Sequence, residues 1–260
     1  VANRLDPIAC MDNFKITETD NDVTWQAGNR KIVCRPPYWE LKGEHMGVDV
    51  DLLIAGDGPS IPYHGTWDKL HEAGIAGNEQ LGVAEGTITY QGEVYTLDEG
   101  WAVRERTCLG KDYNVPKLLA GKAGYIWGWV FSEELKLFCF AQGGSGHFAG
   151  RVFIDNGIID FDAEGTNVEV LDSWVDPRTM AEQATAWRIV MESKEGRLEL
   201  EVRTWSRYLF GFHLIDAYTT HSGALGRSHG SFTFPDGRKV LLKEKIAYFE
   251  QGFATELAAC

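Results

Sequence analysis

Most of the chain alternates between hydrophobic and polar residues with a period of two, which is typical of half-buried β-strands. The alternation is clear in residues 14–19 and 48–52. Asp, Asn and Gly residues interrupt it at short intervals, where tight turns would follow the strands. Regularly spaced strands separated by turns predict an all-β protein, built as a barrel or a sandwich.

A unit of glycine, strand, turn and strand recurs along the chain. Its turns contain Gly, Asn or Asp, which tolerate the backbone conformations of short hairpin loops. The pattern predicts three copies of this unit and one further hairpin. The predicted strand pairs are 86–90 with 93–97, 150–154 with 158–161, 230–234 with 238–242, and 187–192 with 197–202.

Some segments depart from the strand pattern. Helical periodicity appears briefly at residues 67–73 and 177–186. Residues 111–122 have no alternation, which indicates a lid or a connection between two β units. We therefore expect two similar β units, residues 1–130 and 131–260, packed side by side with a ligand pocket.

The acidic balance of the chain limits its partners. The 260 residues include 38 Asp and Glu against 25 Lys and Arg, so the formal net charge is −13. This charge repels phosphate backbones, which argues against a nucleic-acid partner. No run approaches the roughly 20 apolar residues of a membrane span, and no signal-peptide pattern is visible near the start. We expect a cytoplasmic protein, and the sequence leaves a homo-oligomer open.

The cysteines and histidines predict no metal site. The five Cys are odd in number and widely spaced, and the seven His lack the spacing of zinc ligands. We therefore expect reduced thiols and no metal or other cofactor. Nine Trp, nine Tyr and thirteen Phe instead suit the walls of an apolar cavity, so the expected partner is a small hydrophobic substrate.

The densest cluster of polar and aromatic side chains lies in residues 63–72. His71 and Glu72 are the expected catalytic residues, because an imidazolium or a protonated carboxyl can donate a proton to an alkene or a carbonyl. The alternative is a solvated loop followed by one helical turn. The expected substrate-binding residues of this cluster are Tyr63, His64 and Trp67.

A second cluster combines Glu79 with Arg104, Glu105 and Arg106. On a strand, Arg104 and Arg106 would share one face and Glu105 would take the other. Glu79 and Arg104 are expected to bind substrate, and the alternative is a structural network of salt bridges.

Two tryptophans are expected in the wall of the substrate cavity. Trp127 and Trp129 alternate with Ile126 and Gly128, so both rings would point to one face of a strand. The alternative is ordinary core packing.

His213 and Asp216 form a third candidate pair, in a cluster at residues 211–218 that is followed by His221 and His229. Burying a charged carboxylate inside a β run is costly, so an acid there would favour its protonated form. The alternative is an acid that faces solvent. We expect His71 or Glu72 from the first half to act with Asp216 or His213 from the second, because a pocket between two β units is lined from both.

Several segments resemble the AttH-like and carotenoid 1,2-hydratase (hydroxyneurosporene synthase) superfamily. In both, an acid-Gln pair, here Glu79-Gln80, precedes a strand that ends in a Gly turn. Of the family's Arg-Asp-His-Ser-Trp-Gly signature, the run 100–110 matches the leading Arg and the closing Gly, whereas the signature's His and Trp are not matched. The matching segments are residues 78–95, 100–110, 124–131 and 143–150.

The resemblance implies two lipocalin-like β units with an apolar pocket. Members of this superfamily include carotenoid hydratases and fungal Diels–Alderases, which act on polyenes or terpenoids without a metal. We therefore expect a cofactor-free hydratase, cyclase or isomerase that works by acid catalysis on a small terpenoid- or polyene-like substrate. A non-catalytic lipocalin-like binder of an apolar ligand and a pericyclase are the alternatives.

Overall fold

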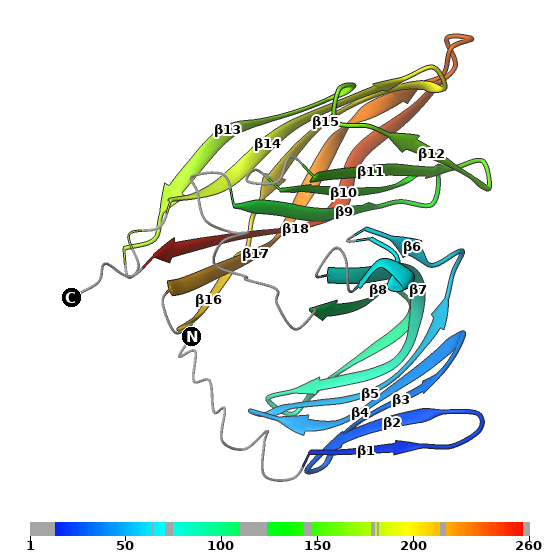
Figure 1. The fold of residues 1–260 in the computed structure, drawn as a ribbon, viewed down its shortest axis with the longest axis vertical. Coiled ribbons are helices and arrows are strands. Elements are labelled where there is room, and N and C mark those ends of the chain that lie inside the picture. Colours follow the sequence, from blue (N-terminus) through cyan, green and yellow to red (C-terminus); the bar gives the residue numbers. More distant parts are fainter. Residues whose placement is uncertain are drawn as a thin grey trace. The chain divides into compact units, whose positions relative to one another are not determined.

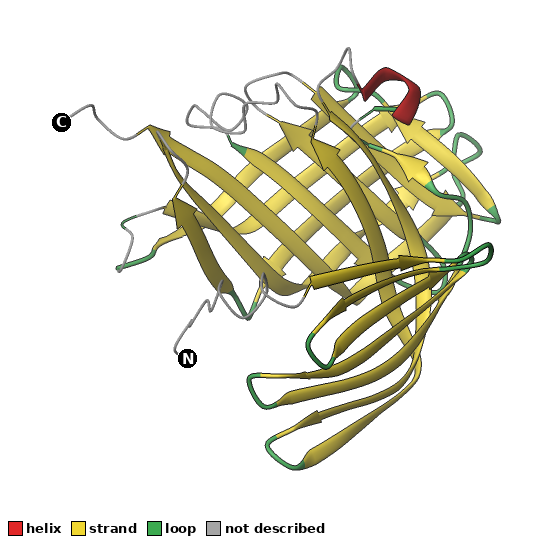
Figure 2. Ribbon diagram, turned by 60° about the horizontal axis from the view of Figure 1, so that its bottom comes forward, coloured by secondary structure: helices red, strands yellow, loops and turns green. Residues whose placement is uncertain are grey.

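The computed structural model describes residues 14–63, 65–70, 75–109, 124–142, 147–177, 180, 182–213 and 217–256. Nearly all of these residues lie in antiparallel β-strands (Figure 1), and the strand-rich character is plain in Figure 2. The chain divides into two compact units, Val1–Tyr113 and Asn114–Cys260. The predicted all-β class is confirmed.

The first unit contains an eight-stranded antiparallel sheet that curls into a half-barrel (Figure 1). The strand order is β1-β2-β3-β4-β5-β7-β6, and β8 pairs with β7. Its elements are β1 (Phe14–Glu18), β2 (Val23–Ala27), β3 (Arg30–Arg35), β4 (Tyr38–His45), β5 (Val48–Gly56), β6 (Ile61–Pro62), the 3-10 helix η1 (Trp67–Lys69), β7 (Ile75–Tyr90) and β8 (Glu93–Leu109).

The second unit contains a ten-stranded antiparallel sheet. The order is β12-β11-β10-β9-β18-β17-β15-β14-β13, and β16 pairs with β17. Its strands are β9 (Tyr125–Phe131), β10 (Lys136–Gln142), β11 (His147–Ile154), β12 (Gly157–Phe161), β13 (Thr166–Val175), β14 (Glu182–Ser193), β15 (Gly196–Thr204), β16 (Tyr208–His213), β17 (Ala217–Thr233) and β18 (Lys239–Glu256).

Alternation along the strands of the second unit creates its hydrophobic core. On β14, Trp187, Ile189 and Met191 are buried, whereas Arg188 between them and Glu192 after them are exposed. The Trp187 ring stacks on Phe249 of β18, with ring centroids 5.2 Å apart. One face of the sheet therefore supplies the core and leaves the other face for polar and aromatic side chains.

All four predicted hairpins are present. In two of them the turn residues have the positive φ angles that tight hairpin loops require, 53° at Gln91 and 85° at Gly92, and 51° at Asp155 and 62° at Asn156. The closing register pairs are Tyr90–Glu93, Ile154–Gly157, Ser193–Gly196 and Thr233–Lys239.

The prediction of a helix at residues 177–186 is wrong for the residues of this range that the structure describes. Strand β14 begins at Glu182, because this stretch runs directly into the alternating sequence from Trp187 onward. Near the other expected helix, Trp67–Lys69 forms the single 3-10 turn η1. Within the described parts of the chain, no helix is long and apolar enough to cross a membrane.

The boundary between the compact units falls between residues 113 and 114, whereas the sequence suggested a boundary near 130. Strand β9 begins between these two positions and ends at Phe131, and it pairs with β10 and β18 of the second sheet. Its Trp-rich sequence therefore contributes to the second unit.

Candidate functional site

Three neighbouring strands of the second unit bring polar and aromatic side chains to one face of the sheet. Residues directly opposite each other in an antiparallel pair point to the same face. Register across β9, β18 and β17 places three rows side by side. The rows are Tyr125–Gly252–His221, Trp127–Glu250–Gly223 and Trp129–Tyr248–Leu225.

Two glycines in these rows make room for tyrosine rings. A Cβ atom at Gly252 would lie 2.2 Å from the ring of Tyr125. A Cβ atom at Gly223 would lie 2.4 Å from the ring of Tyr208, its direct partner on β16. Each tyrosine ring therefore lies across a strand at a position where only glycine fits. The position of the glycine limits where the tyrosine hydroxyl can lie.

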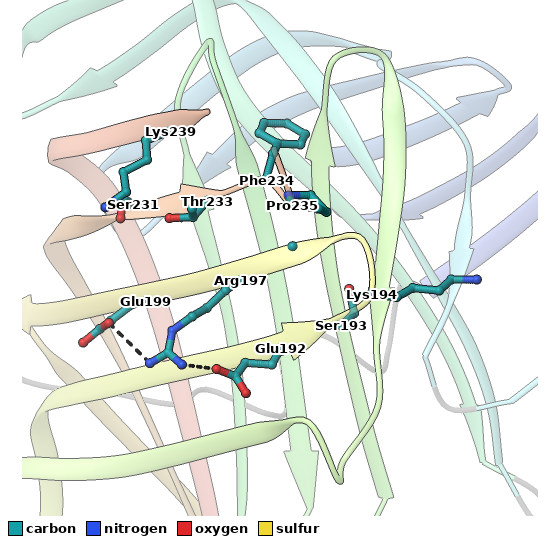
Figure 3. Close-up of a pocket in the computed structure, with 11 residues that line it drawn as sticks. Glu192, Ser193, Lys194, Arg197, Glu199, Ser231, Thr233, Phe234, Pro235 and Lys239 are labelled. Carbon is teal, nitrogen blue, oxygen red and sulfur yellow. Dashed lines mark hydrogen bonds and ion pairs between the residues drawn. The ribbon is translucent and has the colours of Figure 1, made fainter. Parts of the chain in front are cut away.

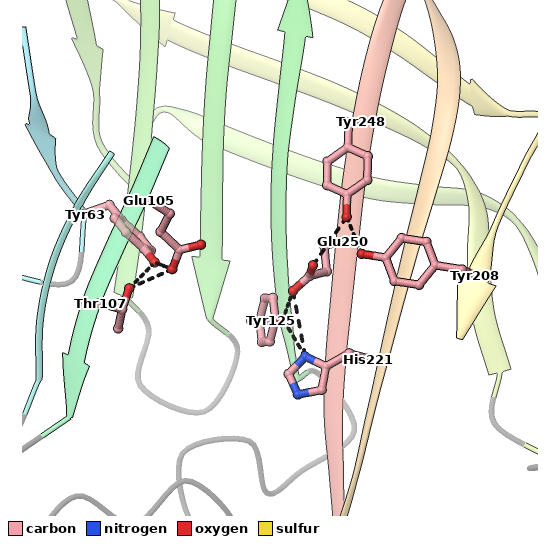
Figure 4. Close-up of polar contacts among 8 residues, drawn as sticks. All are labelled: Tyr63, Glu105, Thr107, Tyr125, Tyr208, His221, Tyr248 and Glu250. Atoms are coloured by element: carbon pink, nitrogen blue, oxygen red, sulfur yellow. Dashed lines mark hydrogen bonds and ion pairs between the residues drawn. The ribbon is translucent and has the colours of Figure 1, made fainter. Parts of the chain in front are cut away.

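The centre of the site is a contact among a phenol, a carboxylate and an imidazole (Figure 4). The Tyr125 hydroxyl donates to Glu250 Oε1 and lies 2.8 Å from His221 Nδ1. His221 Nδ1 and Glu250 Oε1 are 3.7 Å apart, and their side chains are 14% and 23% exposed. Partial burial strengthens these contacts, because little water competes for them.

These contacts determine the tautomer of His221. A carboxylate can only accept a hydrogen bond, so Tyr125 uses its one hydroxyl proton on Glu250. The Tyr125 oxygen must then accept from His221, which places a proton on Nδ1. In the neutral ring, Nε2 therefore holds the lone pair that can take up a proton.

Two more tyrosines lie on the Oε2 side of Glu250. The Tyr248 hydroxyl donates to Glu250 Oε2 at 3.5 Å, and the Tyr208 and Tyr248 hydroxyl oxygens are 2.5 Å apart. Burial raises the pKa of Tyr248, and the neighbouring Tyr208 and Glu250 raise it further. Burial also raises the pKa of Tyr208. Both phenols therefore keep their protons near neutral pH and act as donors.

The first unit has its own phenol–carboxylate contact, also drawn in Figure 4. The buried Tyr63 donates to Glu105 Oε1, and Thr107 Oγ1 donates to the same oxygen at 2.7 Å. Burial, followed by the charge of Glu105, raises the pKa of Tyr63. Glu79 lies directly opposite Glu105 on β7 and is 0% exposed. Two of the predicted binding residues, Tyr63 and Glu79, thus lie near one carboxylate.

Arg104 points to the opposite face of β8 from Glu105, as the alternation predicts. Its guanidinium lies 4.7 Å from the centroid of the buried Trp39 ring. Burial lowers the pKa of Arg104 from its ordinary value. Arg106 stacks similarly on Trp67 at 5.3 Å, and Trp67 is half-exposed. The predicted residues Arg104 and Trp67 therefore make cation–π contacts.

The two predicted tryptophans of β9 have different surroundings. Trp127 is partly exposed and meets Tyr248 edge to face, with ring centroids 5.6 Å apart. Trp129 is fully buried and packs against Phe138 at 5.0 Å and Phe153 at 5.8 Å. Trp127 therefore adjoins the polar contacts around Glu250, whereas Trp129 belongs to an aromatic stack.

Most of the predicted catalytic residues are not placed by the structure. The predicted catalytic residues His71, Glu72 and Asp216, and the predicted binding residue His64, lie outside the described residues. The backbone of His213 ends β16 opposite Tyr218, and its side chain lies outside the described part. Sequence reasoning missed Tyr125, Tyr208, Tyr248 and Glu250 as site residues, and it noted His221 only as a neighbour of the cluster at residues 211–218. The one local signal was the alternating run Tyr248-Phe249-Glu250-Gln251-Gly252.

A cavity of about 500 Å³ lies at the ends of the β14–β15 and β17–β18 hairpins (Figure 3). Three of its charged side chains are well exposed and contact one another, since Arg197 pairs with both Glu192 and Glu199. Salt bridges at such exposed positions contribute little and are screened by salt. The contacts around Glu250 are the better candidate site, because they combine partial burial with groups able to transfer protons.

No family model matches the sequence, and no curated protein matches it. The fold is similar to a protein provisionally assigned as AttH from Nitrosomonas europaea, with a TM-score of 0.61 and 14% identity over 95% of this chain and 73% of that one. It is also similar to kievitone hydratase from Nectria haematococca, with a TM-score of 0.50 and 10% identity over 95% and 86% of the two chains. The predicted resemblance is thus confirmed at the level of the fold.

Proposed function

We propose that this protein is a cofactor-free hydratase-type lyase that adds water to, or removes it from, a small hydrophobic terpenoid- or polyene-like substrate. One observation carries the proposal, the contact of Tyr125 with both His221 and Glu250. It provides a largely buried imidazole whose Nδ1 side is held by a phenol and a carboxylate. The fold shared with kievitone hydratase supports the same class of reaction.

Hydration begins when protonated His221 gives its Nε2 proton to one carbon of the double bond. The π electron pair forms the new C–H bond, and the other carbon becomes a cation. A water oxygen attacks this cation and forms the C–O bond, and its extra proton returns to Nε2. The net change is the addition of one water molecule, and dehydration follows the same steps in reverse.

Tyr125 and Glu250 support His221 through the Nδ1 side of the ring. The Tyr125 oxygen accepts from Nδ1, and the negative charge of Glu250 stabilises the imidazolium through the shared tyrosine. Nearby aromatic rings stabilise the cationic intermediate. Trp127 and Tyr248 lie next to Glu250, and a cation over such a ring gains about 0.5–2 kcal/mol.

The sequence-based assignment of His71 or Glu72 acting with Asp216 or His213 remains a prediction. It names other donors for the same acid catalysis. Turnover of His71→Ala, Glu72→Gln, His213→Ala and Asp216→Asn, each compared with His221→Gln, separates the two assignments. The residue that moves the proton is the one whose loss costs about 10²–10⁴-fold in rate.

A non-catalytic binder of an apolar ligand is the second candidate. Such a protein has no use for a largely buried carboxylate and imidazole, whose desolvation costs free energy in an apolar site. The contacts around Glu250 therefore favour an enzyme over a carrier.

Matched histidine variants test the proposal. His221 and His229 both lie on β17, and His229 pairs with Glu244 at the surface. We expect His221→Gln to lower the hydration rate of prenylated or terpenoid alkenes by about 10²-fold or more, with His229→Gln within a few-fold of the parent. Equal rates for the two variants would contradict the role of His221.

A further inference from the structure

We propose that Tyr248 and Tyr208 are positioning residues that hold Glu250 and thereby set the tautomer of His221. This inference rests on the proposed function, in which Nε2 of His221 transfers the proton. The hydrogen bonds of the two tyrosine hydroxyls lead to Glu250. Their effect passes through the carboxylate between them and Tyr125 (Figure 4).

The two oxygens of Glu250 accept from opposite sides. Tyr125 donates to Oε1, and Tyr248 donates to Oε2 at 3.5 Å. The Glu250 side chain is 23% exposed, so the sheet alone does not confine it. A donor at each oxygen opposes rotation of the carboxylate, and the Tyr248 contact therefore keeps Oε1 in place for Tyr125.

Tyr208 strengthens this second contact. Since Tyr248 uses its proton on Glu250, the Tyr208 hydroxyl must donate to the Tyr248 oxygen, and the two oxygens are 2.5 Å apart. Hydrogen bonds in such a chain polarise one another and strengthen the next donor. Gly223 leaves room for the Tyr208 ring, since a Cβ atom at position 223 would lie 2.6 Å from the hydroxyl oxygen of Tyr208.

The tautomer of His221 depends on which acceptor Tyr125 chooses. With Glu250 held, Tyr125 donates to the carboxylate and Nδ1 of His221 carries the proton. If the carboxylate turns away, the Tyr125 proton can point to Nδ1 instead. The neutral ring then carries its proton on Nε2, and the atom that should accept a proton from water is blocked.

Nitrogen-15 NMR of the imidazole rings tests this directly in the full chain, because the two tautomers differ in the shifts of Nδ1 and Nε2. The His221 signal is identified by its loss in His221→Gln. At a pH above the ordinary histidine range, we expect the parent to carry the proton on Nδ1. We expect Tyr248→Phe to shift His221 toward the Nε2-protonated form, and Tyr208→Phe to shift it less in the same direction.

Tyr38→Phe is the matched control, because Tyr38 is a half-exposed tyrosine of the first unit. It should leave the His221 signal unchanged. The kcat for hydration should fall about tenfold in Tyr248→Phe, the effect typical of groups that orient a functional histidine. If Tyr248→Phe does not fold, Tyr208→Phe decides alone, because Tyr208 is 45% exposed and tolerates the change.

An unchanged His221 tautomer in the folded tyrosine variants would overturn the inference, whatever the activity. A tautomer that responds as expected in a protein without hydratase activity would overturn the proposed function and leave the positioning contact in place.

Discussion

Gly252 is the residue on which the geometry of the site most depends. Its missing side chain leaves the space that the Tyr125 ring fills, and an added Cβ would lie 2.2 Å from that ring. Tyr125 in turn is the residue that contacts both His221 and Glu250. A single methyl group at position 252 is therefore expected to displace the hydroxyl that joins the two.

We expect Gly252→Ala to lower activity at least tenfold and stability by about 1–3 kcal/mol, the usual cost of overpacking. Urea unfolding and hydration rates measure the two effects. Gly157→Ala is the control, because a Cβ there would meet its nearest neighbour at an ordinary 3.4 Å. Normal activity in Gly252→Ala would show that the position of Tyr125 is unimportant.

The buried thiol and phenol groups should make the protein less stable at alkaline pH. Burial raises the pKa of Cys139 to about 12, above the ordinary value of 9.0. The stability that this thiol contributes is complete below pH 9 and is lost as the pH rises toward 12, because only the unfolded thiol ionises in that window. The raised pKa values of Tyr63 and Tyr248 act in the same direction.

The free energy of unfolding should therefore fall between pH 9 and 11, with Cys139 contributing up to about 1.4 kcal/mol per pH unit. Urea titrations at several pH values give the slope. Cys139→Ala should reduce this slope. The loss of packing in this variant lowers the free energy of unfolding equally at every pH, so it does not affect the slope. A slope that is the same with and without the thiol would contradict the assigned burial effect.

At the scale of elements, the hairpins were predictable because their determinants are local. Alternation defines each strand, and Asn or Gly at the turn supplies the positive φ angle that closes it. The helix prediction at residues 177–186 was wrong because the small and polar residues there fit a helix as well as a strand. Pairing of β14 with β13 and β15 stabilises the strand, and such pairing cannot be seen in a short stretch of sequence.

The turn between β11 and β12 gives a prediction at this scale. Asn156 has a φ angle of 62°, which Asn tolerates better than Ala does. We expect Asn156→Ala to destabilise the protein by about 1 kcal/mol, and Asn156→Gly to leave stability nearly unchanged. Thermal unfolding of the two variants checks this, and equal losses would show that backbone conformation is not the cause.

At the scale of the whole molecule, the contacts around Glu250 could not be predicted from the sequence. Tyr125 is 96 residues from His221 and 125 residues from Glu250. Periodicity shows which face of a strand each side chain takes, but it does not show which strands become neighbours. Local crowding instead favoured residues 63–72, of which Tyr63 lies in a phenol–carboxylate contact.

The central claim is that the protein protonates a carbon–carbon double bond and adds water to it. The most direct test is turnover of terpenoid or prenylated substrates in D₂O enriched in ¹⁸O, followed by mass spectrometry of the product. The account predicts a product with one carbon-bound deuterium and one ¹⁸O atom, formed by the parent and by His229→Gln but strongly reduced in His221→Gln. A rearranged product that contains neither isotope, or binding without turnover, would contradict it and favour a pericyclase or a carrier.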